Sequence, residues 1–247
     1  MLNLVVDIGN TRSKIGLFED GTMIGQWVWG NENFSWEDLK TTATNHHAQN
    51  IILSTVRQSP DEAVWQNLGN HFFCIELSEA TPLPFQNLYR TPQTIGKDRL
   101  AVVAGAQALF PNRHCLIADA GTCITYEVLT ADGAYLGGNI APGLRMRLEA
   151  MHRFTAKLPL HEPGDTENRI GYDTRSAMLN GAQEGMVLEL EGYAQYCRDL
   201  YGEVEVVLTG GDADFLAKKM KSKIFVDQNL VLRGLDQILS YNVHQSK

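Results

Sequence analysis

A segment near the N-terminus recurs in the middle of the chain without a gap, and this internal repeat restricts the possible folds more than any other feature. Leu4–Gly25 aligns with Leu116–Gly137, with identical residues at seven positions. Each copy contains an apolar run ending in Asp-x-Gly, a second apolar run, an Asp-Gly pair and a third run. An Asp-Gly pair between apolar runs is typical of a β-hairpin, but turn chemistry alone does not explain the matched Asp-x-Gly. The repeat therefore predicts two similar halves that each begin with three strands.

The remainder of the chain alternates between strand and helix patterns. Apolar runs of strand length occupy residues 51–56, 72–77, 204–209 and 224–226. Apolar residues recur at helical spacing over residues 98–109, 144–151, 173–200 and 230–239. The alternation predicts an α/β fold with a boundary near Pro111–His114, which gives domains of residues 1–112 and 113–247. Two stretches that contain several prolines, 78–97 and 155–169, predict irregular loops.

The composition excludes several classes of protein. The formal net charge of −8, from 21 basic and 29 acidic residues, leaves no basic surplus for the phosphates of a nucleic acid. The four cysteines include no CxxC pair, so neither a disulfide framework nor structural zinc is expected, and a cytoplasmic location is favoured. The sequence MLNLVVDIGN predicts a strand and not a signal peptide. No apolar run approaches the roughly 18 residues of a membrane span.

The first Asp-x-Gly turn, which begins at Asp7, suits phosphate binding. Gly9 has no side chain, so the backbone N–H groups of the turn can approach an anion, and short polar side chains follow it. Asp7 alone would repel phosphate, so we expect it to hold a hydrated Mg²⁺ that bridges to phosphate oxygens.

Two later segments extend this pattern. Asp119, Gly121 and Thr122 repeat the turn in the second half, and Leu208–Asp212 forms a further glycine turn between a strand and a helix. We expect the Asp-x-Gly turns to grip a polyphosphate in a cleft between the domains, and the glycine turn to let adenine or its ribose approach the backbone. The order of these segments resembles the phosphate-1, phosphate-2 and adenosine segments of the superfamily of acetate and sugar kinases, heat-shock ATPases and actin. The resemblance implies a duplicated actin-like (ribonuclease-H-like) ATPase fold, with two similar domains and a cleft between them.

Within that superfamily the chain resembles the type III pantothenate kinases over nearly its whole length. Their DxGNT motif matches Asp7–Thr11, and their DxGT motif matches Asp119–Thr122. Between them, a Tyr followed by Gly-x-Asp-Arg matches Tyr89 and Gly96–Arg99. Their GGxIxPG segment matches Gly137–Gly143. The combination of motifs is specific to this family.

The resemblance implies a role for each matching residue, in the phosphorylation of pantothenate to 4′-phosphopantothenate that begins coenzyme A biosynthesis. Asp98 is the expected general base, Asp119 is the expected ligand of potassium or ammonium, and Mg²⁺ accompanies ATP. The expected ATP-binding residues are Asp7, Ile8, Gly9, Asn10, Thr11, Arg12, Ser13, Lys14 and Thr122. The expected pantothenate-binding residues are Tyr89, Gly96, Lys97, Asp98, Arg99 and, across a homodimer, Thr174.

Three residues depart from the usual family pattern. Asp173 stands before Thr174 where Asn is usual, Lys97 replaces a small residue, and Ser13 replaces Thr. The Lys97 side chain places an additional cation beside the expected base. The reaction itself suits the residues, because pantothenate offers a hydroxyl as nucleophile and a carboxylate that Arg99 can hold with two hydrogen bonds.

Three other functions stay open at the level of sequence. A non-catalytic accessory or regulatory protein could keep the nucleotide-binding fold, although the joint presence of Asp7, Asp98 and Asp119 speaks against it. Another small-molecule kinase of the superfold is possible, but acetate kinases and most sugar kinases are longer and lack the Tyr and Gly-x-Asp-Arg combination. An actin-like filament protein needs extra subdomains, for which 247 residues leave little room.

Overall fold

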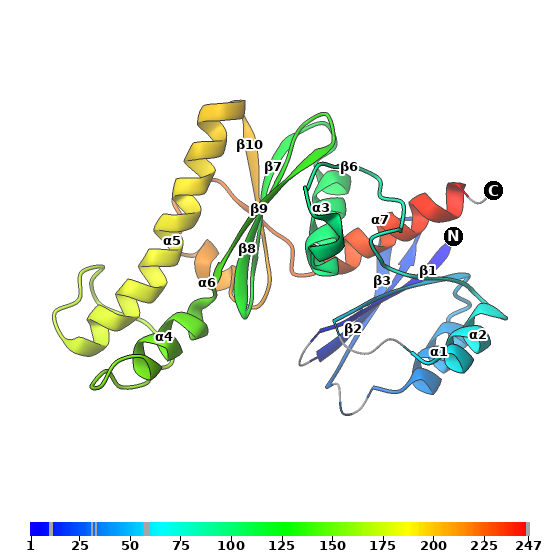
Figure 1. Ribbon diagram of the computed structural model, residues 1–247, viewed down its shortest axis with the longest axis horizontal. Helices are drawn as coiled ribbons and strands as arrows, with labels where there is room; N and C mark the ends of the chain where they lie inside the picture. Colours follow the sequence, from blue (N-terminus) through cyan, green and yellow to red (C-terminus); the bar gives the residue numbers. More distant parts are fainter. Residues whose placement is uncertain (10–11, 31, 33, 57–59, 246–247) are drawn as a thin grey trace. The chain divides into compact units, whose positions relative to one another are not determined.

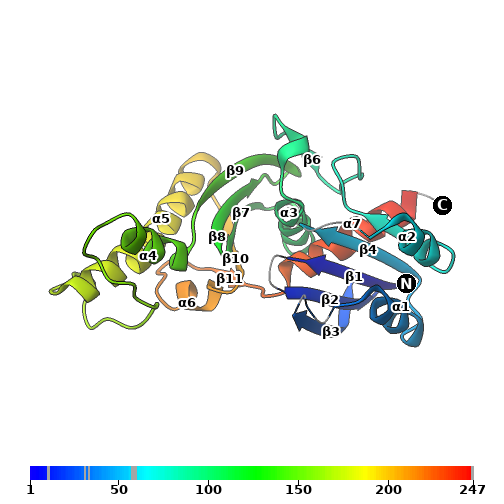
Figure 2. The ribbon, with the colours of Figure 1, turned by 60° about the horizontal axis from the view of Figure 1, so that its bottom comes forward.

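The computed structural model describes residues 1–9, 12–30, 32, 34–56 and 60–245. The chain divides into two compact units, which Figures 1 and 2 show. Unit 1 comprises Met1–Pro111 and Asn229–Lys247, and unit 2 comprises Asn112–Gln228. Each unit contains a mixed sheet with helices packed against it, which confirms the predicted α/β class. Within the described ranges no helix is both long and apolar enough to cross a bilayer.

Unit 1 is built on a sheet that combines a hairpin with parallel strands. The sheet consists of β1 (Leu2–Ile8), β2 (Arg12–Glu19), β3 (Thr22–Gly30), β4 (Asn50–Thr55) and β5 (Phe73–Glu76), and the unit also contains the short β6 (Gln86–Asn87), which is not part of this sheet. Its helices are α1 (Trp36–Asn45), α2 (Glu62–Gly69), the 3-10 helix η2 (Pro92–Thr94), α3 (Lys97–Leu109) and α7 (Leu230–Gln245). The strand order is β3-β2-β1-β4-β5, with antiparallel pairing from β3 to β1 and parallel pairing from β1 to β5.

Helices cover both faces of the unit 1 sheet. Successive side chains of a strand point to opposite faces, and Leu4, Val6 and Ile8 of β1 pack with apolar residues of α1 and α2 in one core. The other face carries α7, which contacts β1, β2 and β4 and packs against α3 (Figure 2). Because Asp7 lies between Val6 and Ile8, its side chain belongs to the face that carries α7.

Helix α7 belongs to unit 1, which differs from the predicted boundaries that placed all of residues 113–247 in one domain. Its apolar face, which includes Leu235, is fully buried, and so is Asp236. The side-chain amide nitrogen of Asn3 on β1 donates a hydrogen bond to the Asp236 carboxylate at 2.7 Å. The side-chain oxygen of Asn3 accepts one from the side-chain nitrogen of Asn50 at 2.8 Å. Helical spacing of apolar residues specifies that one face is buried but not which sheet receives it, so the pattern could not assign α7 to a unit.

Unit 2 is built on a second mixed sheet. Its strands are β7 (His114–Ala120), β8 (Cys123–Leu129), β9 (Ala134–Pro142), β10 (Val204–Thr209) and β11 (Phe225–Val226), and its helices are α4 (Leu144–Arg153), α5 (Thr174–Tyr201) and α6 (Ala213–Ala217). The strands follow the order β9-β8-β7-β10-β11, antiparallel from β9 to β7 and parallel from β7 to β11. Side chains of β7, β8 and β10 form one core with α4, α5 and α6, and Figure 1 shows these three helices on the same side of the unit 2 sheet.

The two sheets share their strand order and strand directions, which confirms the predicted duplication. The two copies nevertheless do not correspond residue for residue in the structure, although their sequences align without a gap. Asp7 pairs with Lys14, whereas Asp119 pairs with Thr125, because the turn after β1 is one residue longer than the turn after β7. The structural counterpart of Lys14 is therefore Thr125 and not Tyr126, with which Lys14 aligns in the sequence.

Most other predicted elements are confirmed, including α6, the helix expected after the Leu208–Asp212 turn, but α1 and α2 were not predicted. Helices α1 and α2 begin at the capping residues Ser35 and Asp61 and bury few apolar side chains, so their periodicity is weak. The stretch 155–169 contains no helix or strand, as predicted. The stretch 78–97, by contrast, contains β6, η2 and the first residue of α3.

Candidate functional site

Asp7 lies in a row of three polar side chains that crosses the unit 1 sheet at the carboxyl end of β1. Its antiparallel partner on β2 is Lys14, and its parallel neighbour on β4 is Ser54. Directly paired residues on neighbouring strands project to the same face. The Lys14 ammonium, the Asp7 carboxylate and the Ser54 hydroxyl therefore share the face that carries α7. Ser54 is 1% exposed and hydrogen-bonds to the Asp7 carboxylate.

The surroundings of Asp7 disfavour its negative charge. Burial raises the pKa of Asp7 to about 6, although the Ser54 hydrogen bond acts in the lowering direction. The Asp98 carboxylate on α3 raises the pKa of Asp7 further, and Lys14 lowers it. Unit 1 thus brings two sequence-predicted acids, Asp7 and Asp98, close enough for their charges to interact. Neighbouring carboxylates of this kind favour binding of a proton or a cation between them.

The turn after β1 is closed by a hydrogen bond from the Gly9 N–H to the Arg12 carbonyl oxygen, at 3.0 Å. A Cβ added to Gly9 would lie 3.3 Å from that oxygen, so the close approach of the backbone favours glycine. The flanking residues Ile8 and Ser13 are buried. Two residues of this turn that are predicted to bind ATP lie outside the described residues, namely Asn10 and Thr11.

Helix α3 begins within the predicted Gly-x-Asp-Arg segment. Gly96 is its N-cap residue, and Asp98 Oδ1 accepts a hydrogen bond from the Arg99 N–H at 2.9 Å. A Cβ added to Gly96 would collide with that same oxygen, so this position of the carboxylate requires glycine. The Asp98 carboxylate therefore stands at a helix N-terminus, where unpaired N–H groups favour a negative charge.

Arg99, the residue that follows Asp98 in the chain, contacts the ring of Tyr89. Arg99 is 5% exposed, and its guanidinium carbon lies 5.4 Å from the centre of the Tyr89 ring, within the range of a cation–π contact. Lys97 extends toward Glu76 at the end of β5, with Nζ 3.4 Å from the carboxylate. The additional cation in the Gly-x-Asp-Arg segment thus has an anionic partner other than Asp98.

The corresponding row in unit 2 has different chemistry. Asp119 pairs with Thr125 on β8 and with Thr209 on β10, so a hydroxyl takes the place of the Lys14 ammonium. The Thr125 hydroxyl is buried and, among the described residues, has no hydrogen-bond partner. Gly210 has a φ of 91°, and a side chain there would collide with the Asp119 carboxylate. A carboxylate between hydroxyl groups is a donor set that suits a hard cation.

A pocket of about 380 Å³ opens at the turns that follow β7 and β10 in unit 2. It brings together the second Asp-x-Gly turn, the later glycine turn and the beginning of α4. Its lining residues are Gly121, Thr122, Arg145, Met146, Glu149, Gly211 and Asp212. Gly143, the N-cap of α4, packs so closely that a side chain there would collide with the Gly121 and Thr122 carbonyl oxygens. The start of α4 is therefore fixed against the turn that carries Thr122.

Thr174 is the first residue of α5, and it is exposed. The residue before it, Asp173, caps the helix by accepting a hydrogen bond from the Ser176 N–H at 2.7 Å. The Ser176 hydroxyl accepts from the Asp173 N–H in return, which completes a capping box. Asp and Asn are similarly effective N-caps, so the departure from Asn at this position leaves the helix start, and hence Thr174, in place.

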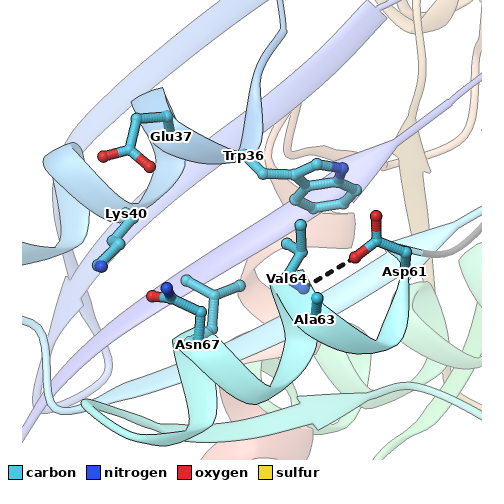
Figure 3. A pocket seen from close by; sticks show the side chains of 8 residues that line it. Trp36, Glu37, Lys40, Asp61, Ala63, Val64 and Asn67 are labelled. Atoms are coloured by element: carbon cyan, nitrogen blue, oxygen red, sulfur yellow. Dashed lines mark hydrogen bonds between the residues drawn. The ribbon is translucent and has the colours of Figure 1, made fainter.

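A different pocket, of about 280 Å³, lies between α1 and α2 on unit 1 (Figure 3). The Trp36 ring lies over Val64, and the Asp61 carboxylate accepts a hydrogen bond from the Val64 N–H to cap α2. Its other charged side chains, Glu37 and Lys40, come from α1. No sequence-predicted site residue lines this pocket, so we locate the candidate site at the Asp-x-Gly turns.

The sequence analysis missed Ser54, Glu76, Thr125, Arg145 and Glu149, and it placed Thr209 in the glycine turn without relating it to Asp119. Ser54 and Thr209 stand at the carboxyl ends of parallel strands, where α/β proteins bind ligands, so their position is a usable signal. Arg145 and Glu149 have the spacing of any charged residues on an amphipathic helix, and nothing in the sequence distinguishes them.

We expect the carboxyl carbon of Asp7 to titrate with a midpoint near pH 6 in ¹³C NMR spectra, because its pKa is raised to about 6. Ser54→Ala should move the midpoint upward by removing a hydrogen bond to the charged form, and Asp98→Asn should move it downward by removing a neighbouring negative charge. Any binding that needs the Asp7 charge should accordingly weaken as the pH falls through about 6. Ser35→Ala, at the cap of α1, is the matched control. Equal midpoints in all four proteins would show that neither group acts on Asp7.

Comparisons with known proteins identify relatives of this chain. The sequence model of the type III pantothenate kinase family matches residues 3–196. A type III pantothenate kinase of Phocaeicola vulgatus is 42% identical, with 98% of this chain and 99% of that protein covered. A type III pantothenate kinase of Christiangramia forsetii is 38% identical, with 99% and 100% covered.

Solved structures share the fold at lower identity. A Campylobacter jejuni protein described as a conserved Baf family transcriptional activator gives a TM-score of 0.62 at 20% identity, covering 98% of this chain and 99% of that one. A glucokinase from an Antarctic psychrotroph gives 0.56 at 12% identity, covering 97% and 99%. These likenesses show the two-domain ATPase fold of the actin and sugar kinase superfold. The family model and the full-length relatives show that the chain belongs to the type III pantothenate kinase family.

Proposed function

We propose that this chain transfers the γ-phosphoryl group of ATP to the primary hydroxyl of pantothenate, which is the first step of coenzyme A biosynthesis. The proposal rests mainly on the arrangement at the start of α3. There the negative charge of Asp98 raises the pKa of Asp7, and the Arg99 guanidinium lies over the Tyr89 ring. A proton acceptor beside a group that binds carboxylates suits a substrate with a hydroxyl and a carboxylate. The activity named for the relatives supports the same reaction. We place the reaction in the cytoplasm, which is consistent with four free cysteines.

Phosphoryl transfer depends more on position and charge than on covalent chemistry. Asp98 accepts the hydroxyl proton while the pantothenate oxygen bonds to the γ-phosphorus and the bond from that phosphorus to the ADP oxygen breaks. Arg99 binds the pantothenate carboxylate through its two-pronged guanidinium, and the Tyr89 ring orients it. Gly96 makes room for the Asp98 carboxylate, and Lys97 completes the substrate loop.

We assign ATP binding to residues 7–14 of unit 1 and to Thr122 of unit 2, which lines the 380 Å³ pocket. Mg²⁺, bound with ATP, neutralises charge on the transferred phosphate. Asp7 suits the hydrated ion, because the Asp7 and Asp98 carboxylates are close enough for their negative charges to interact. A bound cation would reduce the repulsion between them. Lys14, opposite Asp7 in the sheet, adds a cation that can face phosphate oxygens.

Asp98→Asn keeps the shape of the side chain and removes its charge and its ability to accept the proton. We expect turnover to fall by about 10²–10⁴, the usual contribution of a general base. The KM for ATP should change little, because other residues bind the phosphates. A coupled assay of ADP release, with and without pantothenate, measures both quantities.

Two further variants make this result specific. Arg99→Ala should raise the KM for pantothenate more than it lowers turnover. Asp20→Asn, an exposed acid-to-amide change in unit 1, is the matched control and should leave turnover normal. Near-normal turnover of Asp98→Asn at saturating pantothenate would place the base elsewhere, and a defect confined to ATP affinity would place Asp98 in the nucleotide site. A wild-type protein without pantothenate-dependent ADP release would favour a non-catalytic nucleotide-binding function.

We propose that Asp119 supports a potassium or ammonium ion. In unit 1 the residue paired with the acid is Lys14, which supplies an ammonium group of its own. In unit 2 the same register position holds Thr125, and its buried hydroxyl lacks a hydrogen-bond partner within the described part of the chain. An added monovalent cation would supply in unit 2 the charge that Lys14 supplies in unit 1, with oxygen ligands from Asp119, Thr125 and Thr209.

Activity in a sodium-only buffer should therefore rise when potassium or ammonium is added. Thr125→Val keeps the shape but removes the hydroxyl, so it should weaken the response, whereas Thr125→Ser should retain it. Equal rates with sodium and potassium in the wild type would contradict the cation proposal and leave the kinase proposal standing.

We propose a homodimer in which Thr174 of the partner subunit completes each pantothenate pocket. Helix α5 supports this arrangement, because Leu188, Tyr196 and Leu200 are 64%, 62% and 55% exposed, and apolar surface of this kind favours association. Sedimentation should give twice the chain mass of 27.5 kDa. Mixing inactive Asp98→Asn and Thr174→Ala subunits should restore part of the activity, since one of the two sites in the mixed dimer is intact. A fully active monomer would rule the arrangement out.

A further inference from the structure

The unit 2 pocket contains charged side chains that none of the steps above uses. Besides Thr122 and the two glycine turns, it is lined by Asp212 and by Arg145 and Glu149 of α4. Its volume of about 380 Å³ falls within the range of small-ligand sites. Because the pocket extends from the second Asp-x-Gly turn to the later glycine turn, it can take the part of a nucleotide that joins the phosphates to the base.

Asp212 is available to a ligand. It occupies the N-cap position of α6, yet its side chain makes no capping hydrogen bond. Burial raises the pKa of Asp212, and the charge of Arg145 acts in the opposite direction. A partly buried carboxylate without a donor is stabilised by any ligand that brings one.

Glu149 and Arg145 lie four residues apart on α4 and therefore project from the same side of the helix. Arg145 pairs with Glu162 at 2.5 Å. The Glu149 side chain is exposed and lines the pocket, and none of the hydrogen bonds among the described residues involves its carboxylate. The pocket thus offers two acceptors, Asp212 and Glu149, and one cation.

Gly211 leaves space on the pocket wall. A Cβ added there would meet no heavy atom within 4 Å, and the φ of Gly211 lies outside the left-handed region. Gly210 and Gly143 differ, because a side chain at either would collide with backbone atoms. The fold therefore requires glycine at 210 and 143 but not at 211, where a small residue keeps the pocket open.

Charge decides which part of ATP fits beside Asp212 and Glu149. Phosphate groups are repelled by carboxylates, so they belong near Thr122 and Arg145. Ionised carboxylates can only accept hydrogen bonds, and the ribose offers two neighbouring hydroxyls that can donate them. A carboxylate that accepts from a ribose hydroxyl also distinguishes sugars in dinucleotide sites.

On the basis of the kinase function proposed above, we propose that Asp212 and Glu149 bind the 2′ and 3′ hydroxyls of the ATP ribose. The pocket then selects ribonucleotides over deoxyribonucleotides, and α4 contributes to this selection through Glu149.

The test compares ATP with 2′-deoxy-ATP and 3′-deoxy-ATP as phosphoryl donors. In the wild type, kcat/KM for ATP should exceed that for each deoxynucleotide by about tenfold or more, which is the usual effect of losing a hydrogen bond to a charged group. Asp212→Ala and Glu149→Ala together should bring both ratios close to one, mainly by lowering the value for ATP. Calorimetric binding of ADP and 2′-deoxy-ADP measures the same preference without turnover.

Inosine triphosphate separates recognition of the sugar from recognition of the base, because it lacks the amino group of adenine. Suppose that the combined Asp212→Ala and Glu149→Ala substitutions change the kcat/KM ratio of ATP to inosine triphosphate but leave the deoxynucleotide ratios unchanged. The carboxylates then recognise the base, and the proposal is wrong. A wild type that uses ATP and the deoxynucleotides equally well also overturns it.

Two glycine variants show whether the nucleotide occupies this pocket. Gly211→Ala places a methyl group in the open space and should weaken ADP binding severalfold. Gly69→Ala, at the end of α2, meets equally open surroundings and should leave binding unchanged.

A protein that binds ADP with a ribose preference but phosphorylates no pantothenate would contradict only the proposed reaction. A protein that phosphorylates pantothenate without a ribose preference would contradict only the present proposal.

Discussion

Both units depend on the position of one strand. β1 and β7 each pair antiparallel with a hairpin strand on one side and parallel with a later strand on the other. The carboxyl end of each therefore lies where the strand order changes direction, which is the place where open α/β sheets bind ligands. Asp7 and Asp119 stand at these two ends, and the neighbouring strands supply Ser54 and Thr209. A shift of either acid by one residue would turn its side chain into the apolar core on the opposite face.

The duplication preserves the backbone and changes the chemistry. Both middle strands have a register irregularity at the equivalent place, between Leu17 and Phe18 in β2 and between Val128 and Leu129 in β8. The extra residue in the turn after β1 nevertheless shifts β2 by one position relative to its sequence alignment with β8. A shift of one residue exchanges the two faces of a strand. For this reason Tyr126 is buried among residues of α4 and α5, while the acid of unit 2 faces a hydroxyl.

The α/β class, the duplication and the main helices could be predicted from the sequence, because apolar periodicity and matched turns are local signals. The register shift could not, since a longer turn between β8 and β9 restores the alignment and hides it. The pairing of Ser54 with Asp7 depends on which strands become neighbours, and the contribution of Glu149 depends on how α4 meets the turn at Thr122. These are tertiary relations, and a single sequence contains no pattern that specifies them.

The relation between Asp7 and Asp98 shows how such distant contacts can determine a site. The two acids are far apart along the chain, and the segment between them includes the irregular stretch that precedes α3. Helix α3 instead obtains its position by packing against α7, where Gly105 and Gly234 are so tightly enclosed that a side chain at either would collide with backbone of the facing helix. Helix α7 is tied in turn to β1, the strand of Asp7, by the buried hydrogen bond between Asn3 and Asp236. The acids are thus positioned through β1, α7 and α3, so the last helix of the chain is a structural requirement of a site that lies at the end of its first strand.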